Sequence, residues 1–263
     1  MKIPFYQVDS FSDRPFHGNP AAVCVLDDWL DDELLAAIAA ENNLSETAFL
    51  VREDEGWRIR WYTPAVEVNL CGHATLAAAH VAFSELGVAD VPLTFASRSG
   101  PLSITPLGSG RYRMDFPAVF SEACDPPLVV AQALGTTPDQ VRVAGEDYLC
   151  VLPDAAAVRG LEPDMHRLGF VEARGVIVTA PGEDTDICSR FFGPHVGVPE
   201  DPVTGSAHCA LAPYWSERLG RSRMTAAQLS ARGGRLEVEH RGDRVWLEGP
   251  CLTIIRGQVE LPA

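Results

Sequence analysis

The sequence predicts an α+β protein built from two similar halves, and three observations support this fold class. Strand-like and helix-like patterns are mixed along the whole chain rather than separated into blocks. A short glycine-led turn that opens an alanine-rich helix occurs twice, at Gly72 and at Gly205, about half the chain length apart. The length of 263 residues suits two domains of about 120–130 residues each.

The elements of the first half follow from residue pattern. Phe5–Phe11 alternates apolar and polar side chains and is expected to form a strand, while Ser12–Pro20 is rich in turn-forming residues and is expected to form a loop. The acids Asp31–Glu33 are typical of a helix start, and Ala74–Gly87 is an apolar helical segment that ends at a glycine. Further strands are expected at Ala21–Leu26, Ala48–Val51, Trp57–Tyr62, Leu93–Ala96 and Arg111–Phe116.

The second half repeats this order of elements. Helical residues are expected across Ala155–Leu168 and from Gly205 to Leu219. Strands are expected at Gln140–Val143, Tyr148–Leu152, Gly175–Ala180, Cys188–Phe192, Leu229–Arg232, Arg235–His240, Arg244–Glu248 and Leu252–Val259. A proline-marked joint at Phe116–Pro127 gives an N-terminal lobe of residues 1–118 and a C-terminal lobe of residues 119–263. The last strand, about residues 252–263, could return to the first lobe.

Composition limits the kinds of partner. Hydrophobic residues make up 46% of the chain and charged residues 22%, which is typical of a globular protein with a full core. The net charge of −15 argues against binding to nucleic acid, which needs a basic surface, and against docking on anionic lipid. No secretory signal is recognisable, and no apolar run reaches about 18 residues. We therefore expect a cytoplasmic protein that binds neither nucleic acid nor membrane.

The cysteines favour neither disulfides nor a metal site. The seven cysteines are odd in number, dispersed and free of any C-x-x-C pair, which is typical of buried thiols that act as small hydrophobic residues. A zinc site needs clustered Cys and His ligands at regular spacing. Cys71-Gly72-His73 and His208-Cys209 are too closely spaced for such a cluster, so no metal is expected.

The two glycine-led turns are candidates for an anion-binding site. A helix that starts at small residues presents free backbone N–H groups and the positive end of its dipole. Gly72 and His73 open the first such helix, and Gly205 and Ser206 open the second. Two helix starts that faced each other would hold an anionic ligand from both sides, and clefts between domains are preferred ligand sites. The sequence thus indicates a small acidic substrate held between two lobes.

Glu46 and His73 are candidates for proton transfer. Glu46 follows a predicted helix and shares a strand face with Ala48 and Leu50, where loss of solvation would raise its pKa; an exposed loop glutamate is the alternative. His73 lies in the first turn of its helix, whose dipole disfavours the imidazolium form. A neutral His73 could therefore form a hydrogen bond to substrate; a histidine packed at a helix start is the alternative.

The second turn adds Asp201 and Ser206. Asp201-Pro202 is typical of a turn or a cap, and Ser206 of a helix-opening hydroxyl; beyond capping, Asp201 could orient His73 across the cleft. Cys71 is a further candidate acid or base, because a helix N-terminus lowers the pKa of a thiol. The matching position in the second half is Thr204, so a mechanism with two thiols is not available, and a buried, inert thiol is the favoured interpretation of Cys71.

Several segments together resemble the PhzF family of phenazine-biosynthesis isomerase-like proteins. The segments are Phe5–Phe11, Gly18–Val23, Asn43–Leu50, Cys71–Ala74 and Asp201–Ala207. Each is short, but their order, spacing and occurrence in both halves make the match specific. The resemblance implies the α+β fold of diaminopimelate epimerase. That fold has two pseudo-symmetric lobes, each an antiparallel barrel-like sheet wrapped around a central helix, with the active site between them.

The resemblance also implies a chemistry. PhzF-type isomerases move a proton within a cyclohexadiene amino acid, using a glutamate and no cofactor. Glu46 corresponds to that glutamate, and His73, Asp201 and Ser206 correspond to the polar residues of the two turns. The substrate-binding residues implied are Ser45, Gly72, His73, Gly205 and Ser206.

The sequence thus favours a cofactor-independent isomerase that acts on a small carboxylate substrate through one base, Glu46. A homodimer is plausible from the resemblance. One alternative is an amino-acid racemase or epimerase that uses Cys71, which predicts loss of activity in Cys71→Ala. Another is a non-catalytic protein that binds small anions, which predicts stabilisation by ligand without any product.

Overall fold

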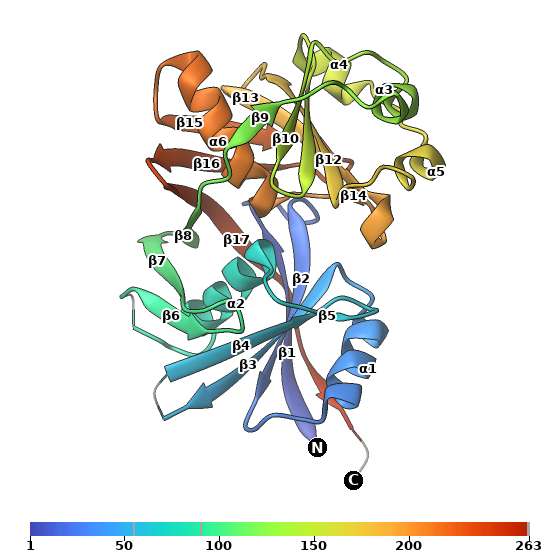
Figure 1. Cartoon of the computed structure of the whole chain (residues 1–263). Helices are drawn as coiled ribbons and strands as arrows, with labels where there is room; N and C mark the ends of the chain where they lie inside the picture. Colours follow the sequence, from blue (N-terminus) through green and yellow to red (C-terminus); the bar gives the residue numbers. More distant parts are fainter. Residues whose placement is uncertain (55, 90, 262–263) are drawn as a thin grey trace. The chain divides into compact units, whose positions relative to one another are not determined.

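The computed structural model describes residues 1–54, 56–89 and 91–261, and the chain divides into two compact units. Unit 1 comprises Met1–Asp115 and Glu248–Ala263, and unit 2 comprises Phe116–Leu247 (Figure 1). The long strand β17 (Arg244–Glu260) begins in unit 2 and continues in unit 1. The last segment of the chain therefore belongs to the first unit.

Unit 1 is a sheet whose strands pair in a closed ring. Going round the ring, each strand pairs with the next in the order β1, β2, β3, β4, β6, β7, β8 and β17, and β17 pairs with β1. The pairs β2–β3 and β4–β6 are parallel. Besides β17, the strands are β1 (Lys2–Ser10), β2 (Asn19–Leu26), β3 (Glu46–Glu53), β4 (Gly56–Tyr62), β6 (Leu93–Ala96), β7 (Leu102–Gly108) and β8 (Arg111–Pro117). The short β5 (Glu67–Val68) adds to β4.

One helix lies against this sheet and is almost wholly buried. The helix α2 (Gly72–Ser84) contacts β1, β2 and β3, and every residue from His73 to Ala82 is buried. A helix enclosed on all sides needs small or apolar residues around its whole circumference, which explains the alanine-rich sequence. A second helix, α1 (Asp32–Asn42), packs Leu35 and Ile38 against Phe49 in a separate core cluster.

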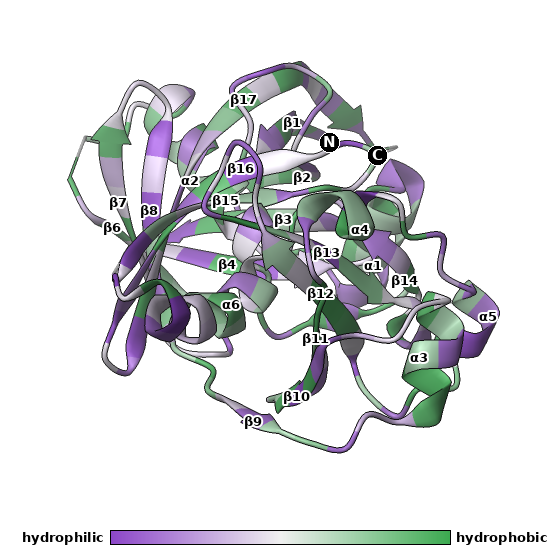
Figure 2. Ribbon diagram, turned by 90° about the horizontal axis from the view of Figure 1, so that it is seen from above, coloured by the Kyte–Doolittle hydropathy of each residue, from purple (hydrophilic) through white to green (hydrophobic). Residues whose placement is uncertain are grey.

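Unit 2 follows the same plan around α6 (Gly205–Leu219). Its strands are β9 (Ser121–Ala123), β10 (Gln140–Ala144), β11 (Asp147–Val151), β12 (Gly175–Pro181), β13 (Ile187–Gly193), β14 (Val198–Asp201), β15 (Arg223–Gln228) and β16 (Gly234–Arg241). The pairs β11–β12 and β13–β15 are parallel. Trp215 of α6 donates a hydrogen bond from Nε1 to Oγ1 of Thr179 on β12, over 3.0 Å. In Figure 2, β12 is hydrophobic over most of its length, as expected for a strand buried at six of its seven residues.

A proline inside α6 leaves a backbone carbonyl free to bind the segment that connects the two halves of the chain. Pro213 lies inside α6 and has no N–H to donate to Cys209, four residues earlier. The carbonyl of Cys209 instead accepts a hydrogen bond from the N–H of Val119, over 3.0 Å. Outside the sheet of unit 2, short helices pack on a separate core cluster that includes Val130, Val158 and Leu168. These helices are α3 (Leu128–Leu134), α4 (Ala155–Arg159) and α5 (Met165–Leu168), and the 3₁₀ helix η1 (Pro194–Val196) follows β13.

The structure confirms the predicted helix Gly205–Leu219 and corrects two predicted elements of unit 2. The expected strand Leu229–Arg232 is wrong, because Ser230 forms a turn with hydrogen bonds to Pro202 and Gly233, and the strand is β15, which ends at Gln228. The single helical stretch Ala155–Leu168 is wrong as well. It is two short helices, because Gly160 ends the first and Pro163 lies between them.

Two other features bear on the predictions from composition. Among the described residues, no helix combines the length and the apolar character needed to cross a bilayer. All seven cysteines are free thiols, and all except Cys124 are buried.

Candidate active site

The loop between β1 and β2 places a buried asparagine beside the first turn of α2. Gly18 has a φ of +73°, and a Cβ there would lie 2.2 Å from the carbonyl oxygen of Ser10, so only glycine fits. The carboxylate of Asp9 accepts a hydrogen bond from the N–H of Phe16 over 2.8 Å and closes the loop. The next residue, Asn19, is fully buried at the start of β2.

Glu46 is the first residue of β3, and a left-handed turn delivers it there. Asn43 ends α1 with a φ of 48°, a conformation that asparagine tolerates better than most residues. The half-buried Leu44 and Ser45 follow, and Glu46 then pairs with Ala21 of β2 in the parallel register. The side chain of Asn42 donates a hydrogen bond to Thr47 over 3.0 Å, which supports the turn. The segment Asn43–Leu50 therefore holds a carboxylate at the start of a buried strand.

The start of α2 is held by β1. Ser10, at the end of β1, donates a hydrogen bond to the carbonyl of His73 over 2.8 Å. Cys71 precedes the helix in an extended conformation. The carbonyl of Cys71 accepts two hydrogen bonds from Thr75, one from its N–H over 3.1 Å and one from its hydroxyl over 2.5 Å. These contacts fix the position of the His73 side chain relative to the sheet.

Glu46, His73 and Cys71 form one buried polar cluster. Glu46 Oε2 lies 3.1 Å from His73 Nε2, and the two side chains are 17% and 7% exposed. The other ring nitrogen, Nδ1, lies 3.2 Å from Asn19 Nδ2 and 3.5 Å from Cys71 Sγ. An asparagine amide can donate from nitrogen or accept at oxygen, so Asn19 can serve the ring in its neutral or its protonated form.

The charges of this cluster differ from those expected from the sequence. Burial acts to raise the pKa of Glu46, but the neighbouring His73 and the thiol of Cys71 outweigh it, and the pKa is lowered. Burial acts to lower the pKa of His73, but Cys71 and then Glu46, through their charges and hydrogen bonds, raise that pKa well above 6.5. The expectations of a raised Glu46 pKa and a neutral His73 are therefore wrong. The reason is that the close approach of Glu46, His73 and Cys71 favours the charged forms of Glu46 and His73 more strongly than burial and the helix dipole oppose them.

Cys71 is a poor base in this environment. Burial, and then the negative charge of Glu46, raise the pKa of its thiol to about 11. The lowering that a helix N-terminus gives does not compensate for these effects. At neutral pH Cys71 is a protonated thiol, in line with the inert role that the sequence favoured.

In unit 2, the corresponding turn is fixed by a buried amide. Gln228, only 1% exposed, accepts a hydrogen bond from the N–H of Thr204 over 2.8 Å and donates one to the carbonyl of Asp201 over 2.7 Å. The hydroxyl of Thr204 donates to Oδ2 of Asp201 over 2.5 Å. Asp201 thus holds the turn before α6, while its suggested role in orienting His73 stays a prediction.

The guanidinium of Arg174 lies beside Ser206, which is in the first turn of α6. Arg174 donates a hydrogen bond from Nη1 to Oγ of Ser206 over 3.0 Å, and its other nitrogens bind the buried carboxylate of Asp147. The guanidinium also stacks on Phe191, 5.3 Å from the ring centre. A cation at a helix N-terminus is disfavoured by the dipole, so an anion bound there would gain from both the helix and Arg174.

Neither of these two helix starts is closed by its own capping side chain, as far as the described residues show. Cys71 and Thr204 make no side-chain cap, whereas Asp154 and Asp164 cap α4 and α5 with hydrogen bonds of 2.8 and 3.0 Å. The N–H groups of a helix's first turn need other partners, and a ligand carboxylate is one.

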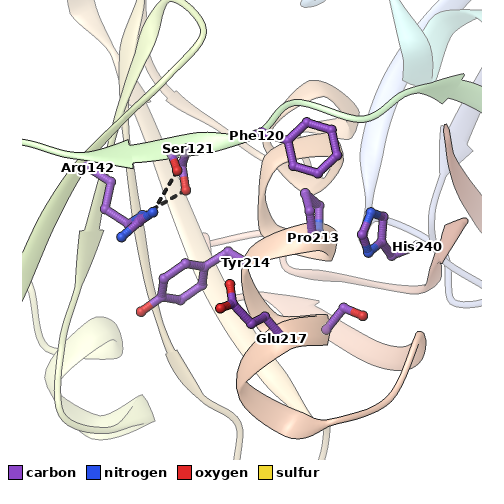
Figure 3. Close-up of a pocket in the computed structure, with 8 residues that line it drawn as sticks. Phe120, Ser121, Arg142, Pro213, Tyr214, Glu217 and His240 are labelled. Atoms are coloured by element: carbon purple, nitrogen blue, oxygen red, sulfur yellow. Dashed lines mark hydrogen bonds between the residues drawn. The ribbon is translucent and has the colours of Figure 1, made fainter. Parts of the chain in front are cut away.

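A separate pocket of about 260 Å³ lies on unit 2, beside α6 (Figure 3). Pro213, Tyr214 and Glu217 of α6 line it, and Arg142 donates hydrogen bonds to Ser121 at its edge. None of the site residues predicted from the sequence lines this pocket.

Sequence reasoning missed three residues that the structure adds to the candidate site. Asn19 lies inside the segment Gly18–Val23, which resembles the PhzF family, and its position after a glycine in His17-Gly18-Asn19-Pro20 is the available signal. Arg174 lies 32 residues from Ser206, and Gln228 lies 24 residues from Thr204. Neither carries a local signal, because strand pairing brings them to these turns.

A sheet-enclosed helix that opens beside a carboxylate–imidazole pair characterises this α+β protein. The family described as phenazine biosynthesis-like protein (PhzC–PhzF) matches residues 8–257, and the chain belongs to this family. An uncharacterized isomerase of Pseudomonas aeruginosa is 52% identical over 261 residues, covering 99% of this chain and all of that protein. With the family, this relative shows that the protein is an isomerase.

Solved structures show the same fold. The crystal structure of a PhzF family protein from Enterococcus faecalis has a TM-score of 0.96 and 43% identity, covering 99% of this chain and 100% of the other. A predicted epimerase from Pseudomonas aeruginosa has a TM-score of 0.75 at 24% identity, covering 99% and 100%, and this likeness shows the fold alone. The predicted diaminopimelate epimerase-like fold is confirmed.

Proposed function

We propose that this isomerase moves a proton within a small substrate that bears a carboxylate, with Glu46 as its single base and acid. One observation carries the proposal: the buried Oε2 atom of the half-buried Glu46 lies 3.1 Å from the imidazole of His73, at the uncapped start of α2. The lowered pKa of Glu46 keeps this carboxylate ionised at neutral pH, which is the state a base must have before it takes a proton.

The reaction we propose uses one carboxylate twice. Glu46 removes a proton from a carbon of the substrate, and the electron pair of the broken C–H bond spreads toward the substrate carboxylate. The N–H groups at Gly72 and His73 stabilise that charge, as donors aimed at developing negative charge do. The protonated Glu46 then delivers the same proton to another carbon on the same face, so no net proton is gained or lost.

His73 has a supporting role in this proposal. Its positive charge beside Glu46 lowers the pKa of that carboxyl group, and Asn19 and Ser10 keep the ring and its backbone in place. Once Glu46 has taken the substrate proton, His73 faces a neutral acid, which favours the return of the proton to the substrate.

The start of α6 supports the choice of a carboxylate substrate. Gly205 and Ser206 open this helix, and Arg174 adds a guanidinium next to the Ser206 hydroxyl. The fork of Arg174 made by Nε and Nη2 is occupied by Asp147, so Nη1, which now donates to Ser206, is the nitrogen that could also reach a substrate carboxylate. We therefore keep Gly205 and Ser206, and add Arg174, as residues proposed to bind the substrate.

Product formation followed by NMR in deuterated water tests the proposal, and transfer of the same proton predicts a product with little deuterium. A thermal-shift screen of metabolite extracts supplies a carboxylate ligand, which is then incubated with the protein in deuterated water and followed by NMR. Glu46→Gln should slow product formation by at least about 100-fold while the ligand still binds, because general acid–base catalysis contributes about that much or more. Glu53→Gln, at the exposed end of the same strand, is the matched control and should react normally.

The thiol alternative gives the opposite pattern. If Cys71 were the base, Cys71→Ala would abolish turnover, whereas a one-base mechanism through Glu46 predicts that this variant still reacts. A Glu46→Gln enzyme that turns over at the normal rate would contradict our proposal.

A further inference from the structure

We propose that Glu46, Cys71 and His73 form a binding site for one zinc-type divalent cation, which blocks the proton-transfer site when it is bound. One donor atom from each of these residues lies within 4.8 Å of the other two. Across residues 1–54, 56–89 and 91–261, no other group of three or more His, Cys, Asp or Glu residues gathers in this way. Among the described residues, this is therefore the one place where the fold brings three such side chains together.

The donors match the preference of zinc. A thiolate sulfur, an imidazole nitrogen and a carboxylate oxygen are the three ligand types that Zn²⁺ binds in proteins. With bonds of about 2.0–2.3 Å, the ligand atoms of a tetrahedral zinc site are about 3.3–3.7 Å apart. The distance of 3.1 Å from Glu46 Oε2 to His73 Nε2 is close to this range. Cys71 Sγ lies 3.5 Å from the other ring nitrogen, Nδ1, so the Cys71 side chain or the His73 ring must turn for Sγ and Nε2 to bind one ion.

Two of the donor atoms are available for a ligand. Glu46 Oε2 and His73 Nε2 are buried, and neither forms a hydrogen bond of good geometry with any described residue. Buried polar atoms without such a partner are uncommon and call for a physical explanation. A cation between Oε2 and Nε2 would satisfy both, whereas in its absence they face each other only as an ion pair.

The surroundings supply the outer support that histidine ligands of metals have. When Nε2 binds a metal, Nδ1 carries the ring proton, and Asn19 lies 3.2 Å away with an amide oxygen that can accept it once the amide turns over. Ser10 fixes the His73 backbone over 2.8 Å. Metal-bound histidines are oriented in the same manner by hydrogen bonds at their second nitrogen.

Binding has a definite proton balance. The Cys71 thiol and the His73 imidazolium each release one proton to solvent, and Glu46 is already ionised. Three protein ligands leave the fourth position of a tetrahedral ion open to water. Because the cation holds the Glu46 oxygen, it removes the base of the proposed reaction; only this inhibitory consequence depends on the proposed function.

Absorption of Co²⁺ tests the site, because a cobalt–thiolate bond gives a charge-transfer band in the near ultraviolet and Zn²⁺ abolishes it by displacement. The purified full chain is titrated with Co²⁺ and then with Zn²⁺, and Zn²⁺ binding is measured separately by calorimetry. We expect one cobalt–thiolate site per chain. Cys71→Ser should remove the band and weaken Zn²⁺ binding by more than the about 10–100-fold that loss of an outer-shell partner costs.

Cys209→Ser is the matched control. Cys209 is also buried and stands next to His208, but it is not part of the three-residue cluster. This variant should keep the cobalt band and the Zn²⁺ affinity. A wild-type protein that gives no thiolate band, or a band that survives in Cys71→Ser, would overturn the proposal.

The proposed cation site and the proposed reaction can be refuted independently of each other. Cobalt spectra and calorimetry report binding without substrate, so they can refute the cation site even if Glu46 is the catalytic base. If the cation binds as expected but Glu46→Gln still turns over substrate, the cation site stands and the proposed function is wrong.

Discussion

The buried pair of Glu46 and His73 should be strongly coupled, and a double-mutant cycle measures the coupling. At the observed 3.1 Å, two unit charges in an effective dielectric of about 20 attract by about 5 kcal/mol. The cost of burying both groups offsets part of this, and removing one partner of a buried pair usually costs about 3–5 kcal/mol. Since Glu46 keeps 17% of its side chain exposed, we expect a coupling free energy near the low end, about 3 kcal/mol.

The two pKa directions set how this coupling changes with pH. The pKa of Glu46 lies below its usual 4.5, so the stability it contributes is present above pH 4.5 and is lost as the pH falls through the lowered value. The pKa of His73 lies well above its usual 6.5, so its contribution is complete below pH 6.5 and is lost as the pH rises through the raised value. The coupling should therefore be largest between pH 4.5 and 6.5 and smaller in alkaline solution.

Urea unfolding followed by tryptophan fluorescence gives the four free energies for wild type, Glu46→Gln, His73→Asn and the double variant. The measurement is made at about pH 5.5, where both groups are charged, and is repeated at increasing pH, where the coupling should fall as the pH passes the raised pKa of His73. The exposed pair of Lys2 and Glu260, at 3.0 Å, is the control and should show a several-fold smaller coupling. Coupling of Glu46 and His73 no larger than this control at pH 5.5, or rising toward pH 9, would refute the ion pair.

Two further predictions concern the support of the site. Gly18→Ala should lower the free energy of unfolding by about 2 kcal/mol or more, because its Cβ would lie 2.2 Å from the Ser10 carbonyl oxygen. Gly87→Ala is the control, since Gly87 has a similar φ but open space around it, and it should lower the free energy of unfolding by less. Thermal denaturation measures both, and equal losses of stability would contradict the steric argument. The Cys71 thiol, with its pKa raised to about 11 and its side chain buried, should react with iodoacetamide at neutral pH far more slowly than in the urea-unfolded chain. Mass spectrometry of the labelled peptides measures this, and equally fast labelling of Cys71 in both states would show that it is not shielded.

Local pattern predicted the elements that depend on short-range signals. Gly205 and Leu219 bound α6 as expected, because a glycine-led turn opens the helix and Gly220, in the left-handed conformation, ends it. The helix α2 begins at Gly72 and ends at Ser84, a small shift from the expected Ala74–Gly87. The strands β5, β7, β9, β14 and β15 and the helix α3 were not predicted. In β7, Pro106 and Gly108 interrupt the alternation, and the pairing with β8 that defines the strand has an irregular register.

The charges of the site were not predictable from the sequence. The motif identified Glu46 and His73 as candidates, but their separation of 3.1 Å results from the parallel pairing of β2 with β3 and from the packing of α2 on both strands. Burial alone predicts a raised Glu46 pKa, and the helix dipole alone predicts a neutral His73. The close approach of Glu46 to His73 and Cys71 reverses both directions, and no spacing along the chain encodes the position of Glu46 beside them.

The difference between the two glycine-led turns bears on where the chemistry lies. In unit 1, His73 at the turn faces the Glu46 carboxylate of β3 at 3.1 Å, beside a protonated thiol, so a potential base and a potential acid lie together there. In unit 2 the corresponding hydroxyl of Thr204 donates to Asp201 and is far too weak an acid to act as a base partner. Both units therefore have the helix start, but only the turn of unit 1 lies beside a carboxylate–imidazole pair. This difference favours a mechanism with one base, Glu46, over a mechanism with two equivalent bases.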